Sequence, residues 1–491
     1  MLRATPGEHR AVNTLLMPSI VLPGVWALAM LGTLGTVATA WRVATAAATG
    51  VVIGAVAELA IAPVAGVPHV VALLVAMLGF VTVRYSARYL VGEPGQTRYL
   101  RALLFTLASV TLVVTTDHLG VLVAAWIASS LGLHELLTFY PDRRPAQLAA
   151  RKKFLIGRLA DAVLVVAAAL VWWEIRTLSI PALATWLVGV ETLPLTLQVA
   201  ALGFALGALL KSAQLPLHGW LIQVMEAPTP VSALLHAGVV NLGGFVLIRL
   251  AALLSLAPAA QALLVVVGGV TVLGAGLVMA TRISMKVRLA WSTCAQMGFL
   301  LLECGLGLYG FAALHLVAHS LYKAHAFLSA GATVARATVA VPQVRPSVVT
   351  VLAAPVLSAV VVAGLWYGTA QTGVTEPPHW VAGGILVLGT APLWWRGMSR
   401  GLVCVVGVAL LALLQHLLFG LLAPDKAASV KLCVLALGFM GLLYLLQGWL
   451  AAAPRSAAAN RLHQLAFAGF HLDEPLSRWV LKVWPLRTGS A

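Results

Sequence analysis

The sequence predicts an all-α membrane protein of about 14–15 transmembrane helices, from its composition, its long apolar runs and the placement of its basic residues. The chain has 491 residues, of which 61% are hydrophobic and only 9% are charged, and its mean hydropathy is +0.98. Soluble domains carry about a quarter charged residues, so this composition argues against a soluble enzyme.

Apolar runs of about 15 to 25 residues follow one another along the chain, each long enough to cross a hydrocarbon core of about 30 Å. The predicted crossings are Leu15–Ala40, Ala44–Val64, His69–Arg84, Ala102–Thr116, Leu119–Phe139, Phe154–Val171, Leu193–Met225, Val231–Leu253, Gln261–Ala280, Leu289–Leu302, Gly310–Ala330, Val348–Trp366, Trp380–Trp395, Gly401–Leu422 and Ala428–Leu450. The N-terminal run lacks a convincing cleavage site, so we expect a retained first helix.

Basic residues collect in alternate loops between these runs, which predicts the orientation by the positive-inside rule. The loops concerned hold Arg84 to Arg101, Arg143 to Arg158, Arg282 to Arg288, Arg396 with Arg400, and Arg455 with Arg461. This pattern places the N-terminus outside and the C-terminal tail in the cytoplasm of a cell with the chain in its inner membrane. The net charge of +16 is then explained by the basic residues of the cytoplasmic loops. We expect membrane lipid as a partner and no nucleic acid.

Lys211 is the clearest candidate for an ion-translocating residue, because it ends an apolar run at 199–210. Pro216 follows shortly after it, and a proline removes a backbone donor and clashes with the preceding turn, so the helix should break beside the lysine. Freed carbonyl groups at membrane depth are tolerated where they line a cavity or are buried in protein. The pattern predicts a hydrated pocket, and the alternative is a lysine that extends to the membrane interface.

Three more titratable residues are candidates for the ion path. Glu135 lies near the end of an apolar helix, where it passes protons to the Lys211 pocket or is an interfacial charge. His236 lies inside a predicted crossing, as a proton carrier or as a hydrogen-bonded core residue. Asp161 follows Arg158 by three residues, so a local ion pair near the cytoplasmic face is expected.

His315, His319 and Lys323 recur at intervals of four, which places them along one helix face. Histidine titrates near physiological pH, so this stripe predicts a proton relay. A metal or haem site at the two histidines is the competing interpretation, but the sequence offers no nearby acidic third ligand. The four cysteines lie singly in apolar stretches without a CxxC motif. We therefore expect no metal, no cofactor and no catalytic residue in this chain.

The tail from Asn460 to Pro485 differs from the rest because charged and apolar residues alternate in it at helical spacing. It predicts a short amphipathic helix that lies on the bilayer surface or docks a cytoplasmic partner. The expected partner-binding residues are Leu476, Trp479, Val480 and Val483. Apolar anchors with a charged border are typical of interface hot spots.

Two blocks of sequence resemble the proton-translocating antiporter-like family, which includes the large membrane-arm subunits of respiratory complex I and of Mrp cation/proton antiporters. The blocks comprise Lys211 to Trp220 with Glu226 to Gly238, and Lys286 to Gly298 with His315 to Ala324. Two departures from the family pattern stand out. Its usual glutamate is replaced by Ile127, and its second broken-helix lysine is absent around Pro355.

The resemblance implies two inverted five-helix repeats, each with one discontinuous helix, at 102–255 and 256–396. Transmembrane helices at 1–101 and 397–455 flank the repeats, and the cytoplasmic amphipathic tail occupies 456–491. The resemblance also implies that Lys211 is the broken-helix lysine and His236 the histidine of the following helix. It assigns His315, His319 and Lys323 to the central relay.

Shorter stretches resemble a narrower family, the DabB membrane subunits of inorganic-carbon accumulation systems. These stretches are Leu136 to Pro145, Arg151 to Leu155, Gln223 to Pro228, and Ala468 to Pro485. In that family the membrane subunit pairs with a large cytoplasmic protein, DabA, that resembles zinc carbonic anhydrases. The resemblance implies that an H+ or Na+ gradient drives uptake and hydration of CO2, with the zinc in the partner and the tail as its docking site.

Two alternatives remain at the level of sequence. One is a membrane subunit of a complex I-like or Mrp-type cation/proton antiporter. The other, from a different class, is the membrane anchor of a redox enzyme that holds quinone or haem. The lack of paired histidine ligands on two helices argues against the second.

Overall fold

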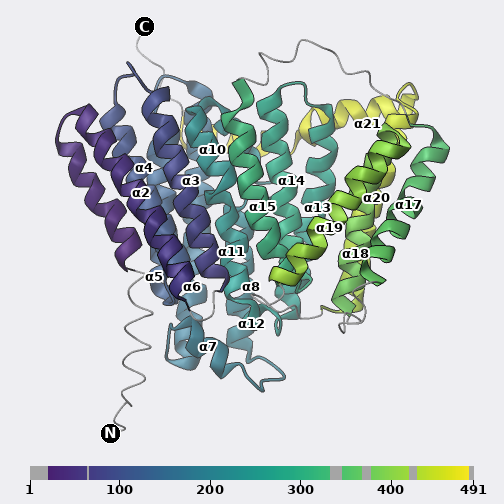
Figure 1. Cartoon of the computed structure of the whole chain (residues 1–491), viewed down its shortest axis with the longest axis horizontal. Helices are drawn as coiled ribbons and strands as arrows, with labels where there is room; N and C mark the ends of the chain where they lie inside the picture. Colours follow the sequence, from purple (N-terminus) through teal and green to yellow (C-terminus); the bar gives the residue numbers. More distant parts are fainter. Residues whose placement is uncertain (1–19, 63–65, 332–345, 368–376, 420–427, 486–491) are drawn as a thin grey trace.

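The structure is a computed structural model that describes residues 20–62, 66–331, 346–367, 377–419 and 428–485. Within these residues the chain is helical, with one isolated β-bridge between His118 and Ser179 and no longer strand. The helices run side by side across one slab (Figure 1), as the composition predicts for an all-α membrane protein.

The N-terminal helices differ from the prediction in several boundaries, most clearly in the turn between the first two. They are a helix at 20–29 continued by η1 (Met30–Leu34), then α2 (Val37–Ile61), α3 (Val67–Tyr89), α4 (Gln96–Thr115) and α5 (Leu119–Leu137). The turn between the first two lies at Gly35 and Thr36, where the Thr36 hydroxyl accepts a hydrogen bond from the Thr39 N–H and caps α2. The predicted boundary after Ala40 was wrong, because apolar residues continue through the turn.

The basic segment predicted as a loop at 143–153 belongs largely to a helix, α6 (Arg144–Ile175). That prediction was wrong because Arg151, Lys152 and Lys153 are buried by contacts with distant parts of the chain. The Lys152 ammonium pairs with Asp473 at 2.6 Å, and Lys153 donates to the Ser130 carbonyl at 2.5 Å. From sequence alone, a cluster of cations is expected to be a solvated loop, because the residues that bury it lie elsewhere in the chain.

The centre of the bundle contains the discontinuous helix predicted at Pro216. The elements are α7 (Ile180–Trp186), α8 (Leu195–Lys211), α9 (Gly219–Gln223), η2 (Val224–Glu226), α10 (Thr229–Ala237), η3 (Val239–Asn241), α11 (Leu242–Arg249) and α12 (Ala251–Leu254). Helix α8 ends at Lys211 and α9 starts after the proline, which confirms the break. The following crossing is also interrupted, at Gly238 between α10 and η3.

The second half consists of longer helices. They are α13 (Pro258–Thr281), α14 (Met285–Gly305), α15 (Tyr309–Leu328), α17 (Val348–Tyr367), α18 (Pro377–Thr390), η5 (Ala391–Arg396), α19 (Met398–Phe419) and α20 (Val430–Ala452). Pro355 lies inside α17 and does not divide it. In the described residues, nine helices are long and apolar enough to cross a membrane, and four shorter apolar helices accompany them.

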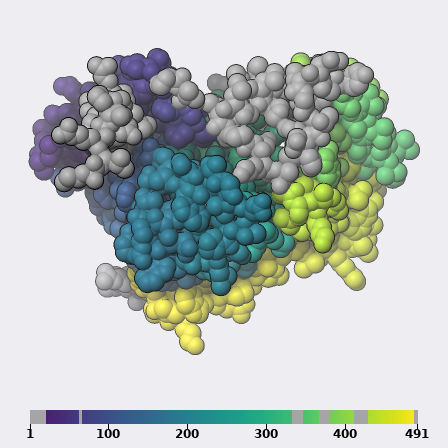
Figure 2. All heavy atoms as spheres, turned by 90° about the horizontal axis from the view of Figure 1, so that it is seen from below, coloured from purple at the N-terminus to yellow at the C-terminus, as the bar shows by residue number. Residues whose placement is uncertain are grey.

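The two ends of the bundle carry different structures. Helices α7 and α12 lie at one end (Figure 1), and the segment around α7 projects at the centre of that face in Figure 2. The C-terminal segment, α21 (Ala457–Phe467), η6 (Gly469–His471) and α22 (Glu474–Val483), runs along one side of the other end. Helix α22 packs against α6.

This packing changes the predicted partner surface of the tail. Val480 is fully buried and Leu476 packs on the core, so neither faces outward in this structure. Trp479 and Val483 are 52% and 57% exposed. The predicted amphipathic helix is present, but half of its apolar face is covered by the chain itself, because Asp473 anchors the start of α22 to α6.

Asp473 holds the tail in place through several contacts. Its carboxylate pairs with Lys152 and accepts hydrogen bonds from Gln223 at 3.3 Å and from the Ser477 hydroxyl at 3.1 Å. Gly219 at the start of α9 is required here, since a Cβ at that position would meet the Asp473 carboxylate. The tail is therefore tied to both α6 and the second half of the broken helix.

We predict that Asp473→Ala lowers the thermal unfolding temperature of the purified protein, because the fully buried Lys152 ammonium loses its anion. Breaking a buried ion pair costs about 3–5 kcal/mol, and since Asp473 is partly exposed we expect about 2–4 kcal/mol. Glu474→Ala, a neighbouring and exposed carboxylate, is the control and should leave unfolding unchanged. Equal unfolding temperatures for both variants would contradict the anchoring role.

Candidate ion-translocation site

A buried group of charges forms around the end of α8. The Lys211 ammonium lies 2.6 Å from one carboxylate oxygen of Asp161 on α6, and Arg158 lies 2.6 Å from the other. The Lys211 and Asp161 side chains are 7% and 9% exposed. One carboxylate thus neutralises one of two cations at membrane depth, and the group as a whole keeps a positive charge.

A small cavity of about 30 Å³ adjoins Lys211. The Trp126 ring on α5 lies 4.9 Å from the Lys211 nitrogen, and Lys153 lines the same cavity. The opposite wall comes from the interrupted helix, at Leu235 and Val240. One water needs about 10–15 Å³, so the cavity has room for water between the lysines and the segment that carries His236.

A second group of polar residues lies between α10 and α15. The His236 ring is fully buried and stacks on Phe327 at 4.4 Å, and neither ring nitrogen has a hydrogen-bond partner among the described residues. The His319 Nε2 atom lies 3.3 Å from the His236 carbonyl oxygen. Both ring nitrogens of this imidazole are therefore available to a water or a neighbouring polar group.

The predicted stripe on α15 continues from His319 in both directions. The ring centroids of His315 and His319 are 5.9 Å apart, and His315 Nδ1 lies 2.8 Å from a carboxylate oxygen of Glu303. In the other direction the buried Lys323 donates to the Leu289 carbonyl at 2.9 Å and the Ser292 hydroxyl at 2.8 Å.

Lys323 has no carboxylate partner in the part of the chain that the structure describes. A charge held at the bilayer centre costs at least about 2.5–3.5 kcal/mol. Lys323 is buried in the bundle with a carbonyl and a hydroxyl as its hydrogen-bond acceptors, so its charge is not balanced by an anion among the described residues.

The helix interrupted at Gly238 lies between the Lys211 group and the polar residues of α15. Because the helix opens there, the Asn241 amide donates both to the Ala237 carbonyl at 2.9 Å and to the Ser320 hydroxyl on α15 at 2.8 Å. One face of this interrupted segment lines the Lys211 cavity, and another contacts α15. The segment thus lies between the first group of charges and the histidine stripe.

The structure does not bring all of the predicted site residues together. Asp161 forms the expected pair with Arg158, and it also pairs with Lys211, which spacing alone did not reveal. Glu135 has an exposed side chain on α5 and does not line the Lys211 cavity. Its proposed role as donor to this pocket has no geometric support here.

Sequence reasoning missed two residues of the site. Lys153 was assigned to a loop, although its position before an apolar run could have suggested a helix that starts earlier. Glu303 ends the apolar run of α14, and only the approach of α14 to α15 shows that it meets His315. In the described ranges, no group of three His, Cys, Asp or Glu residues is arranged to hold a metal ion.

Comparison with known proteins shows similarity over most of the chain. Residues 116–370 match the family of NADH:quinone oxidoreductase/Mrp antiporter transmembrane proteins. A probable inorganic carbon transporter subunit DabB of Hydrogenovibrio crunogenus is 44% identical, over 84% of this chain and 82% of the relative. A probable DabB2 subunit of Halothiobacillus neapolitanus is 38% identical, over 87% and 81% respectively.

More distant relatives share the central part. NADH-quinone oxidoreductase subunit L of Mycobacterium tuberculosis is 37% identical over 53% of this chain and 42% of the relative. The solved structure of the Mrp complex from Dietzia sp. contains a chain with a TM-score of 0.58 and 22% identity. The match covers 97% of the present chain and 58% of that one, and it shows a shared fold.

We predict that Asp161→Asn destabilises the protein and reduces ion-driven transport, because Lys211 and Arg158 then share no anion. The expected loss of stability is about 3–5 kcal/mol, as for other broken buried pairs. Asp117→Asn is the control, since Asp117 pairs with Arg249 away from this site and is 40% exposed. Transport by the Asp161 variant at the rate of the Asp117 variant would contradict a role for Asp161 in the ion path.

Proposed function

This chain belongs to the DabB family of inorganic carbon transporter subunits and to the NADH:quinone oxidoreductase/Mrp antiporter family, and from that premise we propose that it conducts a cation to energise inorganic-carbon uptake. In this proposal an ion gradient across the membrane drives a cytoplasmic partner of the DabA type. The partner carries the zinc and hydrates CO2, and this chain contributes ion movement without catalytic chemistry of its own.

The observation that carries the proposal is the row of buried titratable residues through the bundle. Lys211 with Asp161, His236, His319, His315 with Glu303, and Lys323 come from α6, α8, α10, α14 and α15. Each is costly to bury, and several lack a full set of partners among the described residues. A purely structural role would be served better by apolar side chains of similar volume.

The composition of this row favours H+ as the transported ion. Sodium is held by oxygen ligands, whereas most of these groups are lysines and histidines that bind protons on nitrogen. The two carboxylates of the row each face a cation or an imidazole, at 2.6 Å and 2.8 Å. They are therefore placed to balance charge and exchange protons, not to enclose a metal ion.

We propose that the bundle spans the inner membrane of the cell. The tail then lies on the cytoplasmic side and the α7 end on the outer side. The basic start of α6 and the tail share one end of the bundle, because Lys152 and Asp473 are in contact. Their excess of positive charge supports a cytoplasmic side. The same end exposes Trp479 and Val483 with Arg478 beside them, which supports docking of a soluble partner there.

A subunit of a complex I-like or Mrp-type cation/proton antiporter is the second candidate function. The match of residues 116–370 to that family and the fold shared with the Mrp complex favour it. The higher coverage by DabB relatives favours the first candidate. Co-purification of a large zinc-containing subunit would support the first candidate, and co-purification of respiratory or Mrp subunits the second.

We predict that Lys211→Ala abolishes gradient-driven uptake while the protein still inserts and assembles. The variant removes the exchangeable charge beside the cavity but leaves the helix end intact. Uptake of labelled inorganic carbon by cells, with and without an uncoupler, measures the effect. Wild-type uptake by an assembled Lys211→Ala variant would contradict the proposed function.

We also predict that the double change Trp479→Ser with Val483→Ser releases the soluble partner in a pull-down, because it removes the exposed apolar part of α22. Unlike truncation of the tail, it keeps Asp473 and its anchor on Lys152. Trp173→Ser, an exposed tryptophan at the other end of α6, is the matched control. If the partner stays bound and only membrane association changes, α22 is a lipid-contacting helix.

A further inference from the structure

A cavity of about 440 Å³ lies in the second half of the bundle, between α13 and α14 on one side and α17 to α20 on the other. Most of its lining is apolar. Its polar lining residues are Ser292, Gln296, Glu303, Thr390 and Gln447. Among the described residues that line it, Glu303 is the one ionisable group.

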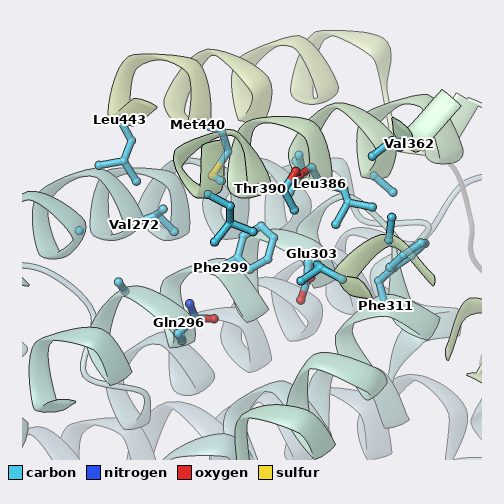
Figure 3. A pocket seen from close by; sticks show the side chains of 18 of the residues that line it. Val272, Gln296, Phe299, Glu303, Phe311, Val362, Leu386, Thr390, Met440 and Leu443 are labelled. Carbon is cyan, nitrogen blue, oxygen red and sulfur yellow. The ribbon is translucent and has the colours of Figure 1, made fainter. Parts of the chain in front are cut away.

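Helix α14 gives the cavity a polar side. Ser292, Gln296, Phe299 and Glu303 are spaced by four, three and four residues, which places them on one helix face. Figure 3 shows Gln296, Phe299 and Glu303 along one side of the cavity, with Met440 and Leu443 of α20 opposite them. The polar side chains of α14 thus line one side of the cavity, and most of the residues on the opposite side are apolar.

Both ends of this stripe connect to the row of buried titratable residues on α15. At one end, the Ser292 hydroxyl accepts a hydrogen bond from Lys323 at 2.8 Å. At the other end, Glu303 lies 2.8 Å from Nδ1 of His315. The cavity therefore runs parallel to the α15 stripe and meets it at two titratable groups.

The cavity satisfies the two conditions for holding water. Its volume greatly exceeds the roughly 10–15 Å³ that one water requires, and water in a cavity needs two to four polar partners. Gln296 and Glu303 supply such partners on α14, and Thr390 and Gln447 supply them from α18 and α20. Water along this side would link Glu303 to Ser292.

We propose that Glu303 is the proton-exchanging carboxylate of the second half and that the polar side of this cavity is its hydrated access route. The proposal rests on the proposed function. In the proposed proton transfer from His315 on α15 to Glu303 on α14, the His315 Nδ1–H bond breaks and a Glu303 O–H bond forms. The imidazolium then becomes a neutral imidazole. Glu303 then gives the proton to water in the cavity and regains its negative charge.

Hydration of the cavity is tested by cysteine labelling. In a Cys404→Ser background, which removes the exposed native thiol, Gln296→Cys should react with a charged, water-soluble methanethiosulfonate. Val266→Cys, at an exposed but membrane-facing site of α13, is the control and should stay unlabelled. An unlabelled Gln296→Cys, in protein that transports normally, would overturn the access route.

The role of Glu303 is tested by neutralising it without changing its shape. Glu303→Gln should slow proton uptake into proteoliposomes on the order of tenfold or more, and Glu303→Asp should restore part of the rate. Val362→Ala shortens an apolar lining residue on α17, away from the polar side of the cavity, and is the control for local packing. Thermal unfolding of each variant verifies that it is folded.

Lys211→Ala measured in parallel separates this inference from the proposed function. Loss of uptake in Lys211→Ala with normal uptake in Glu303→Gln would overturn the role of Glu303 and leave the proposed function intact. Normal uptake in both variants would overturn both. Loss in both, with partial rescue by Glu303→Asp, is the expected result, because a carboxylate that acted only in packing would tolerate glutamine better than aspartate.

Discussion

The ion pair between Lys211 and Asp161 is the interaction on which the arrangement of the bundle centre depends. A lysine at membrane depth is costly unless an anion meets it, and the anion here comes from α6, which packs along α8. The break at Pro216 places the lysine at a helix end, next to a cavity, so its ammonium reaches the carboxylate without entering lipid. Arg158 shares the same carboxylate, which leaves the group with an excess of positive charge.

The sequence predicted the parts of this site that depend on local chemistry. Pro216 broke its helix as expected, and the spacing of His315, His319 and Lys323 placed them on one face of α15, where the structure has them. Residues whose role depends on which helices pack together were not predictable in this way. Glu303 and His315 lie on consecutive helices, and no periodicity relates them. The burial of Lys152 likewise depends on Asp473, which lies in the tail, far along the chain.

The assignment of Glu135 shows the limit of reasoning from proximity in sequence. Glu135 is the nearby acid on the helix where Ile127 replaces the family glutamate, and it was predicted to pass protons to the Lys211 pocket. Helical geometry turns it away, because Trp126 and Leu133 line the cavity while Glu135 is exposed. The carboxylate that contacts Lys211 instead comes from a neighbouring helix, at Asp161, which the sequence had related only to Arg158.

Helix α6 connects the tail to the Lys211 site. Lys152 on it contacts Asp473 of the tail, the adjacent Lys153 lines the Lys211 cavity, and Asp161 pairs with Lys211. Asp473 also contacts Gln223 at the end of α9, the second half of the broken helix. A force on α22 from a bound partner would therefore act on both walls of the Lys211 site, and a change in charge at Lys211 would act back on the tail. Under the proposed function, linkage requires that partner binding and proton movement affect each other equally. The contacts of Asp473 with Lys152 and Gln223 are the direct connection that the structure offers between the tail and the Lys211 site.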